Sequence, residues 1–179
     1  MSYRNRPSSG NRKHRLVVAI TGSSGSAYGL KLLQALRGIS SIEVHLVVSS
    51  SAWITIHHEV GLQENDFKQL SDFYHPYNNI GAPIASGSFS SLGMVIAPCS
   101  VNTMSSIASG LADNLITRAA HVTIKEQRKL ILMIRESPLH LVHLRNMVTL
   151  SEMGCVIAPP IPCFYHNPKT IDDLIENSV

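Results

Sequence analysis

The sequence predicts an α/β fold with three layers, in which helices cover both faces of a doubly wound, mainly parallel sheet. Two observations support this prediction. Five short apolar runs rich in Val, Ile and Leu recur along the chain with little polar alternation, as expected for strands that are buried on both faces. Helix-compatible stretches separate these runs, and this alternation of strand and helix is typical of Rossmann-like and flavodoxin-like sheets.

The expected elements follow in chain order. The strands are Leu16–Ile20, Val44–Ser49, Met94–Ala97, Leu130–Ile134 and Cys155–Ala158. The helices are Ala27–Arg37, Ser51–Val60, Asn102–Lys125, Leu139–Glu152 and Thr170–Asn177. A proline, Pro168, stands just before the last of these helices, where proline suits a helix start.

The segment Gly61–Ser91 interrupts the alternation with several proline, glycine and asparagine residues. Connections of this length tend to be functional or to pack against a partner. Aromatic side chains in a long surface segment suggest a buried contact, so we expect them to form an interface between copies of the chain. These aromatic residues are Phe67, Phe73, Tyr74, Tyr77 and Phe89. Packing of the rings against their own sheet is the alternative.

The length and composition predict a single globular domain. The chain has 179 residues, of which 44% are hydrophobic and 15% charged. We expect the domain to span residues 15–179 and to follow a disordered basic tail, residues 1–14. Residues 1–15 contain five of the 15 Lys and Arg residues, whereas the remaining chain has 10 basic and 12 acidic residues. This balance argues against a nucleic-acid-binding surface.

Three features bear on the location of the protein. No apolar run approaches the roughly 20 residues that a membrane helix needs, and the polar start is unlike a signal peptide. Cys99, Cys155 and Cys163 have neither disulfide nor zinc-site spacing, and the nine histidines do not combine with carboxylates into a metal site. We therefore expect a cytoplasmic protein with no membrane partner and no bound metal. A transit peptide is the alternative for the Arg-rich start, which lacks an amphipathic stripe.

The first candidate binding loop follows the first strand, because ligands of such sheets bind beyond the carboxyl ends of the strands. Gly22 and Gly25 allow a tight turn, and the helix start that follows favours an anion. Ser23 and Ser24 add hydroxyl donors. The loop lacks the GxGxxG spacing, and the second strand ends at Ser49 without an acidic residue. A mononucleotide phosphate is therefore favoured over a dinucleotide, and a plain turn with capping serines is the alternative.

Two further loops add hydroxyl and charged groups. Ser100 and Thr103 stand three residues apart at an expected helix start, where a serine either caps the helix or contacts a phosphate or flavin edge. Arg135 and Glu136 directly follow an apolar run. Arg135 can bind a phosphate through its planar guanidinium, and Glu136 can transfer a proton. A salt bridge at the end of the strand is the alternative for this pair.

Two more groups complete the candidate site. Arg118 and Lys125 are seven residues apart, so they lie on one face of the expected helix. They are of interest because Arg135 and Glu136 follow the next strand. Tyr165 ends the last loop, after three prolines, and offers a hydroxyl to an anion. A packed aromatic ring is the alternative for this tyrosine.

Six strings in this order resemble the UbiX/Pad1 flavoproteins, and the resemblance runs from about residue 15 to residue 179. They are VVAITGSSG at 17–25, ASGSF at 85–89, PCSVNT at 98–103, LITRAA at 115–120, LILMIRESP at 130–138 and PPIPCFYH at 159–166. The resemblance implies a flavin prenyltransferase, which transfers a dimethylallyl group from dimethylallyl phosphate to N5 and C6 of reduced FMN. The prenylated FMN would then serve a UbiD-type decarboxylase. It also implies homo-oligomers in which trimers form a dodecamer.

The resemblance also implies roles for individual residues. FMN would be held by Gly22, Ser23, Ser24, Ser49, Ser100, Val101, Asn102, Thr103 and Arg135. The donor phosphate would be held by Lys125, Arg135 and Tyr165, together with Arg118. The catalytic groups would be Ser24, Glu59 and Glu136. The family carries a further basic residue about two positions beyond Val179, so the resemblance leaves open a truncated domain, a disordered tail left out of the sequence, or a naturally short paralogue. An FMN-dependent cysteine-type decarboxylase and a non-catalytic FMN-binding subunit remain as alternatives.

Overall fold

The computed structural model describes residues 13–179, so that almost all of the expected tail lies outside the described residues. His14, which we assigned to the tail, is instead the first residue of strand β1. Its backbone N–H donates to the carbonyl of Ser41 at 2.8 Å, and it pairs with Ile42 of the neighbouring strand. The first strand therefore begins two residues earlier than its apolar run.

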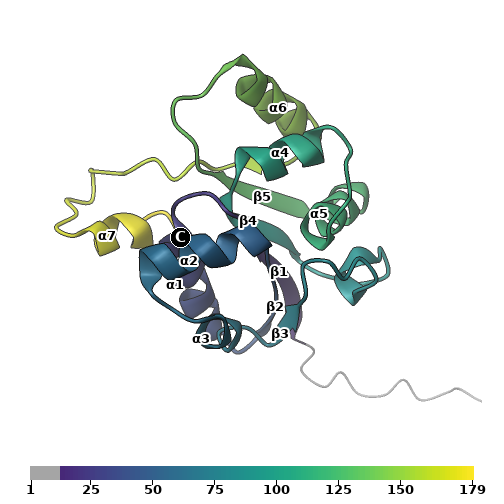
Figure 1. Ribbon diagram of the computed structural model, residues 1–179, viewed down its shortest axis with the longest axis horizontal. Helices are drawn as coiled ribbons and strands as arrows, with labels where there is room; N and C mark the ends of the chain where they lie inside the picture. Colours follow the sequence, from purple (N-terminus) through teal and green to yellow (C-terminus); the bar gives the residue numbers. More distant parts are fainter. Residues whose placement is uncertain (1–12) are drawn as a thin grey trace, which may run out of the picture.

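The predicted parallel α/β sheet is confirmed. Within residues 13–179, six strands, all parallel, lie in the order β3-β2-β1-β4-β5-β6, of which Figure 1 labels the first five. Five of them match the expected runs, and the sixth, β3, comes from the segment 61–91. The strands are β1 His14–Ile20, β2 Ile42–Val48, β3 Phe73–His75, β4 Gly93–Cys99, β5 Lys129–Ile134 and β6 Val156–Ile157.

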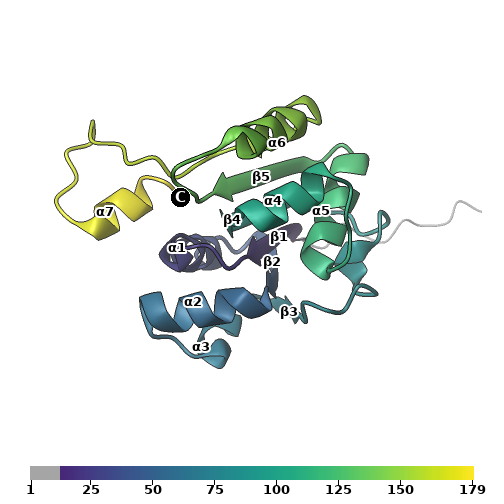
Figure 2. The ribbon, with the colours of Figure 1, turned by 45° about the horizontal axis from the view of Figure 1, so that its top comes forward.

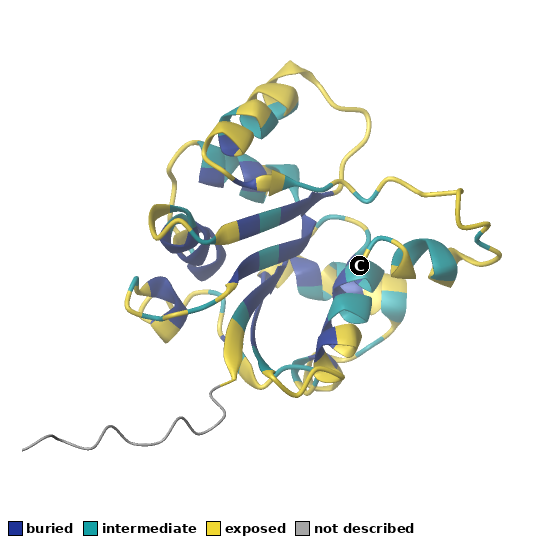
Figure 3. Ribbon diagram, turned by 180° about the vertical axis from the view of Figure 1, so that it is seen from behind, coloured by how far each residue is buried: buried dark blue, intermediate teal, exposed yellow. Residues whose placement is uncertain are grey.

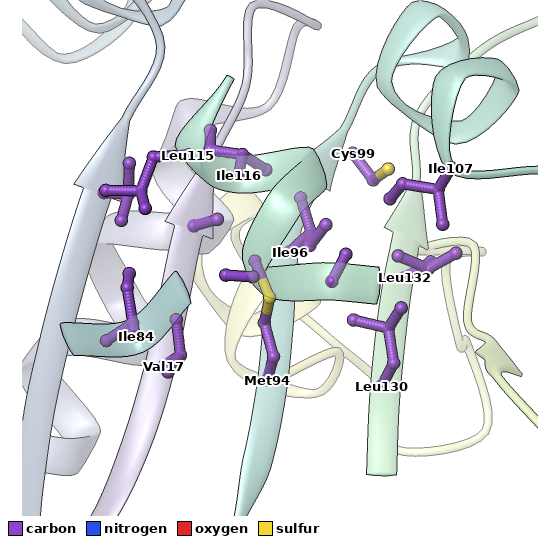
Figure 4. Packing of buried hydrophobic residues seen from close by; sticks show 14 of the residues in the cluster. Val17, Ile84, Met94, Ile96, Cys99, Ile107, Leu115, Ile116, Leu130 and Leu132 are labelled. Atoms are coloured by element: carbon purple, nitrogen blue, oxygen red, sulfur yellow. The ribbon is translucent and has the colours of Figure 1, made fainter. Parts of the chain in front are cut away.

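Helices cover both faces of the sheet, because alternate residues of each central strand point to opposite sides. In β1, Val18 and Ile20 belong to the core under α1, α2 and α3, whereas Val17 and Ala19 belong to the core under α4, α5 and α6. Figure 4 shows part of the second core, and Figure 3 shows that the central strands are buried. The helices are α1 Ser26–Arg37, α2 Ser50–Val60, α3 Glu64–Lys68, α4 Val101–Ala108, α5 Leu115–Lys125, α6 Leu141–Glu152 and α7 Ile171–Glu176.

The expected helix Asn102–Lys125 is two helices, α4 and α5. Gly110 lies between them in the left-handed region, with φ at 80°, which a glycine adopts without the steric penalty of other residues. Asn114 then starts α5 anew, because its side chain accepts a hydrogen bond from the N–H of Thr117 at 3.1 Å. The apolar pattern is continuous across this break, so the sequence pattern alone concealed it.

The segment 61–91 forms α3, β3 and a 3-10 turn, Pro83–Ala85, and its aromatic rings pack mostly within the chain. Phe67 is fully buried, Tyr77 and Phe89 pack on one core, and Tyr74 packs on the other. The alternative, packing within the chain, is therefore observed for Phe67, whereas an interface that includes the partly buried Tyr74, Tyr77 and Phe89 stays a prediction. Phe73 is half exposed.

The last helix is attached to the body by ion pairs. Lys31 on α1 contacts Asp172 at 2.9 Å and Glu176 at 3.0 Å, both on α7. The segment from residue 158 to residue 170 extends away from the body before α7 returns to α1 (Figures 1 and 2). Among residues 13–179, no helix is both long enough and apolar enough to span a bilayer.

Candidate functional site

The loops of the candidate site meet at one edge of the sheet, since the carboxyl ends of parallel strands lie together. Thr21, which directly follows β1, fixes two of these loops to each other. Its hydroxyl donates to the carbonyl of Pro98 at 2.8 Å and accepts from the N–H of Ser100 at 2.7 Å. The N–H of Arg135 donates to the carbonyl of Cys99 at 3.1 Å, which adds a third loop. Sequence reasoning missed Thr21, whose position between a buried strand and Gly22 was the available signal.

The start of α1 is occupied by a side chain of this protein. The carboxylate of Glu59 accepts from the N–H of Gly25 at 2.9 Å, from the N–H of Ser26 at 2.7 Å and from the hydroxyl of Ser26 at 2.6 Å. The anion that we expected at this helix start is therefore provided by α2. Gly25 has φ at 102°, a conformation that turns its N–H toward this carboxylate and that other residues rarely adopt.

The carboxylate of Glu59 is held in its ionised form. Burial alone would raise its pKa, but hydrogen bonds from Ser26, from Ser24 and from the backbone N–H groups of Ser26 and Gly25 outweigh that effect and lower the pKa. A carboxylate in this state accepts hydrogen bonds and accepts protons only weakly. Its contact with Ser24 links it to the exposed part of the first loop.

Close packing between the first two loops requires glycine at position 22 and buries Ser49. A Cβ on Gly22 would overlap the side chain of Ser51, so only glycine allows this approach. Ser49 is buried, and its hydroxyl accepts from the N–H of Ala52 at 3.2 Å as the cap of α2. The same oxygen lies 3.2 Å from the hydroxyl of Ser51. Ser49 is thus engaged within the chain, whereas Ser51 faces Gly22.

The first loop also contains an unsatisfied hydroxyl. The side-chain oxygen of Ser23 is buried and has no hydrogen-bond partner among residues 13–179. Buried hydroxyls are nearly always paired in folded proteins, so this one is available to a bound molecule. Ser24 beside it is exposed.

The start of α4 offers further donors. The hydroxyl of Ser100 accepts from the N–H of Thr103 at 3.3 Å and lies 3.1 Å from the hydroxyl of Thr103, so Ser100 is the helix cap. The N–H groups of Val101 and Asn102 belong to the first turn, where an α-helix provides no partner. These groups can donate to an anion at the helix start. Asn102 is exposed there.

Arg135 and Glu136 are exposed at the carboxyl end of β5. The side chain of Arg135 passes the first loop, since its Cγ lies 3.8 Å from where a Cβ of Gly25 would be. Glu136 accepts from the N–H of Ser137 at 3.0 Å. Within residues 13–179 neither side chain makes an ion pair, so the alternative of a salt bridge at this strand end is not observed.

Lys125 and Arg118 both lie on α5, and Lys125 does not reach this edge in the same chain. Lys125 ends α5 and precedes β5, so it lies at the amino end of that strand, whereas Arg135 follows the carboxyl end. The strand has six residues, which at about 3.3 Å per residue separates its ends by about 20 Å. Figure 2 shows α5 beside the start of β5, away from its arrowhead. Both cations are exposed on α5.

Tyr165 is 92% exposed and lies on the extended segment between β6 and α7. Its ring contacts the ring of His166, with 5.7 Å between centroids. Ile161 and Phe164 on the same segment are also more than 70% exposed. The alternative of a packed aromatic within the chain is therefore not observed. No group of three or more metal-binding side chains occurs in the part of the chain that the structure describes.

Comparison with known proteins agrees with this geometry. The model of the Flavoprotein family matches residues 4–178. The flavin prenyltransferase UbiX of Thauera aromatica is 51% identical over 165 residues, which cover 92% of this chain and 84% of the relative. This chain belongs to the UbiX-type flavoproteins.

The fold of this UbiX-type flavoprotein is similar to that of two solved structures with 45% sequence identity. A structure of AnUbiX in complex with FMN and dimethylallyl pyrophosphate has a TM-score of 0.92 at 45% identity, over 93% of this chain and 88% of the other. A dodecameric FMN-dependent UbiX-like decarboxylase from Escherichia coli O157:H7 has a TM-score of 0.91 at 45% identity, over 92% and 90%. The FMN-dependent cysteine decarboxylase TvaF, at 20% identity and a TM-score of 0.68, shares the fold alone.

Proposed function

We propose that this protein is a flavin prenyltransferase that transfers a dimethylallyl group from dimethylallyl phosphate to N5 and C6 of reduced FMN. The observation that carries the proposal is the placement of Arg135, exposed beside the first loop and followed by the exposed Glu136, in a chain half identical to UbiX. A guanidinium at this point can bind a phosphate that leaves during the reaction, which lowers the barrier electrostatically.

The residues present fit a flavin mononucleotide. The unpaired hydroxyl of Ser23 and the first-turn N–H groups of Val101 and Asn102 are donors without partners from their own loops. The phosphate of FMN cannot accept from the N–H groups at the start of α1 while Glu59 binds them. We therefore assign the phosphate of FMN to the start of α4 and to Arg135. When bound, reduced FMN supplies the nucleophilic N5 and C6 atoms.

Two groups are proposed to handle protons. Ser24 is exposed next to the ionised Glu59, whose hydrogen bonds orient the first loop, so Ser24 is placed to pass a proton while Glu59 positions it. Glu136 is exposed at the carboxyl end of β5 and accepts a hydrogen bond from one backbone N–H. It is the candidate general acid or base near the leaving phosphate.

The site is proposed to be completed by a second copy of the chain. Lys125 lies about 20 Å from Arg135 along β5, so it can bind the same donor phosphate only from another subunit, and Arg118 on the same face of α5 is proposed to act with it. The protein also exposes apolar side chains that assembly would bury. On α6 these are Leu141, Val142, Leu144 and Val148. We propose homo-oligomers of trimers forming a dodecamer, as the dodecameric relative suggests.

The proposal extends to the cellular role. Prenylated FMN made by this enzyme would be passed to a UbiD-type decarboxylase. The three cysteines are unpaired, with Cys163 exposed, and this state suits the reducing conditions of the cytoplasm. A cysteine-type decarboxylase is disfavoured because its representative shares less than half the identity of the UbiX relatives.

Anaerobic incubation of the protein with reduced FMN and dimethylallyl phosphate tests the function. We expect a flavin product heavier by one isoprene unit, and a parallel reaction with the diphosphate donor establishes the donor class. Arg135→Ala should raise the donor concentration required, while an exposed arginine at the far end of α1, Arg37→Ala, serves as the charge-matched control. Bound FMN without product from either donor would leave a flavin-binding subunit. Release of CO2 from a peptide with a C-terminal cysteine would establish the decarboxylase.

A further inference from the structure

We infer that Arg128 is a positioning residue that fixes the segment 85–89 and, through it, the ammonium group of Lys125. The inference rests on the proposed role of Lys125 in binding the donor phosphate. Arg128 stands three residues after Lys125, between α5 and β5, and the side-chain hydrogen bonds that it makes within residues 13–179 both go to the segment 85–89.

The guanidinium of Arg128 binds two carbonyls of this segment. Its Nη1 donates to the carbonyl of Phe89 at 2.6 Å, and its Nη2 donates to the carbonyl of Gly87 at 3.0 Å. The side chain is half-buried, which strengthens these charge-assisted bonds relative to bonds in water. A rigid fork of donors suits two carbonyls that lie two residues apart, and a single ammonium group cannot reproduce it.

The segment lies directly against Lys125. A Cβ on Gly87 would overlap the carboxylate of Glu126 and would lie 2.8 Å from Nζ of Lys125. Lys125 and Glu126 form an ion pair, and the side chain of Lys125 remains 55% exposed. Nζ is therefore confined on one side by the backbone at Gly87 and open to solvent on the other. A shift of this backbone would change where Nζ can lie.

The far end of the segment is anchored independently. The ring of Phe89 lies 4.8 Å from the guanidinium of Arg15 and 4.8 Å from the ring of His45. Both Arg15 and His45 also bind the carboxylate of Glu43, at 3.0 and 2.9 Å. Strands β1 and β2 thus hold Phe89, and Arg128 connects the same segment to the end of α5.

The residue before Arg128, Gln127, has a backbone conformation that is uncommon for its type. Gln127 has φ at 55°, in the left-handed region that a glutamine rarely adopts. This turn ends α5 and lets the N–H of Arg128 donate to the carbonyl of Thr123 at 2.9 Å. The strained residue therefore lies between the two cations and sets their relative direction.

The test compares Arg128→Met and Arg128→Lys with a matched arginine. Arg37 also donates to a backbone carbonyl, that of Gln69 at 3.0 Å, but lies at the far end of α1, so Arg37→Met is the control. We expect Arg128→Met to raise the KM for dimethylallyl phosphate about tenfold or more, because two charge-assisted bonds are lost. The kcat and the affinity for FMN should stay near those of the unaltered protein, and Arg128→Lys should recover part of the loss.

Two further measurements separate positioning from a general structural effect. Amide hydrogen exchange in peptides covering 85–91 should become faster in Arg128→Met and remain unchanged in Arg37→Met, with no ligand required. In a Lys125→Met background, Arg128→Met should add little to the KM, because its effect passes through Lys125.

Several results would overturn the inference. These are an unchanged donor KM in Arg128→Met, full additivity with Lys125→Met, or an Arg128→Lys variant that matches the unaltered protein in both KM and exchange. If Arg128→Met does not fold, the KM and the hydrogen exchange of Arg128→Lys are compared with those of the unaltered protein instead. If the unaltered protein makes no prenylated FMN, the proposed function fails, while the exchange measurement still decides whether Arg128 fixes the segment.

Discussion

Glu59→Gln tests the assignment of this carboxylate to the start of α1. The carboxylate faces four donors, which are the N–H groups of Gly25 and Ser26 and the hydroxyls of Ser26 and Ser24. A glutamine has one acceptor oxygen and an NH2 group that would oppose a donor. Loss of a helix cap costs about 0.5–2 kcal/mol, so we expect the free energy of unfolding to fall by about 1 kcal/mol. For a chain of this length that lowers the melting temperature by about 2–4 °C.

The assay is urea unfolding at a fixed protomer concentration, with Glu64→Gln as the control. Glu64 is exposed, and its one ion pair within the described residues is with Lys68, at 2.7 Å in the next turn; such pairs contribute about 0.3–0.5 kcal/mol. Because the pKa of Glu59 is lowered in the folded state, its stabilisation is complete above its ordinary value of 4.5 and is lost as pH falls through the lower folded value. The difference between the two proteins should therefore shrink in acid. An equal midpoint at pH 7, or a difference that does not change with pH, would refute this assignment.

Three other changes have expected outcomes. Glu136→Gln should leave FMN binding intact and slow formation of prenylated FMN about 100-fold or more in a stopped-time assay, whereas full turnover at every pH would remove Glu136 from the reaction. Thr21→Val should lower the free energy of unfolding by about 1–3 kcal/mol, since the N–H of Ser100 loses its acceptor, and an unchanged urea midpoint would show that the loops do not depend on it. Burial, with the charge of His45 in addition, lowers the pKa of His75 below its ordinary value of 6.5, so the folded state disfavours its protonation. Stability should therefore decline as pH falls below about 6.5, and His75→Gln should flatten that decline in urea titrations; parallel curves would refute the role of His75.

Much of the fold could be predicted because buried parallel strands leave a strong pattern. The run Leu130–Ile134 differs from β5 only by the exposed Lys129 at its start, since both faces of the strand are covered and the other five positions are apolar. Strand β3 escaped prediction because Phe73–His75 is too short to show a period and becomes a strand only through its pairing with β2.

The candidate site could be predicted in part. The loops after β1, β4 and β5 could be brought together from topology, because the chain order of strands fixes which ends share an edge. The relation of Lys125 to Arg135 could not be read from helix periodicity, which orders residues around a helix and says nothing of where the helix ends. The position of Lys125 just before a strand was the neglected signal. The contact of Glu59 with the first loop depends on the packing of α2, which no local pattern reports.

The placement of Lys125 and Arg135 at opposite ends of β5 has a genetic consequence for an oligomer with shared sites. Oligomers built only from Arg135→Ala chains would lack that guanidinium at every site. Oligomers built only from Lys125→Ala chains would lack that ammonium group at every site. Mixed assemblies would contain sites that draw Arg135 from one parent and Lys125 from the other, about one in four at equal expression. Two inactive alleles would then complement each other in the same cell, whereas a site confined to one chain would allow no such rescue.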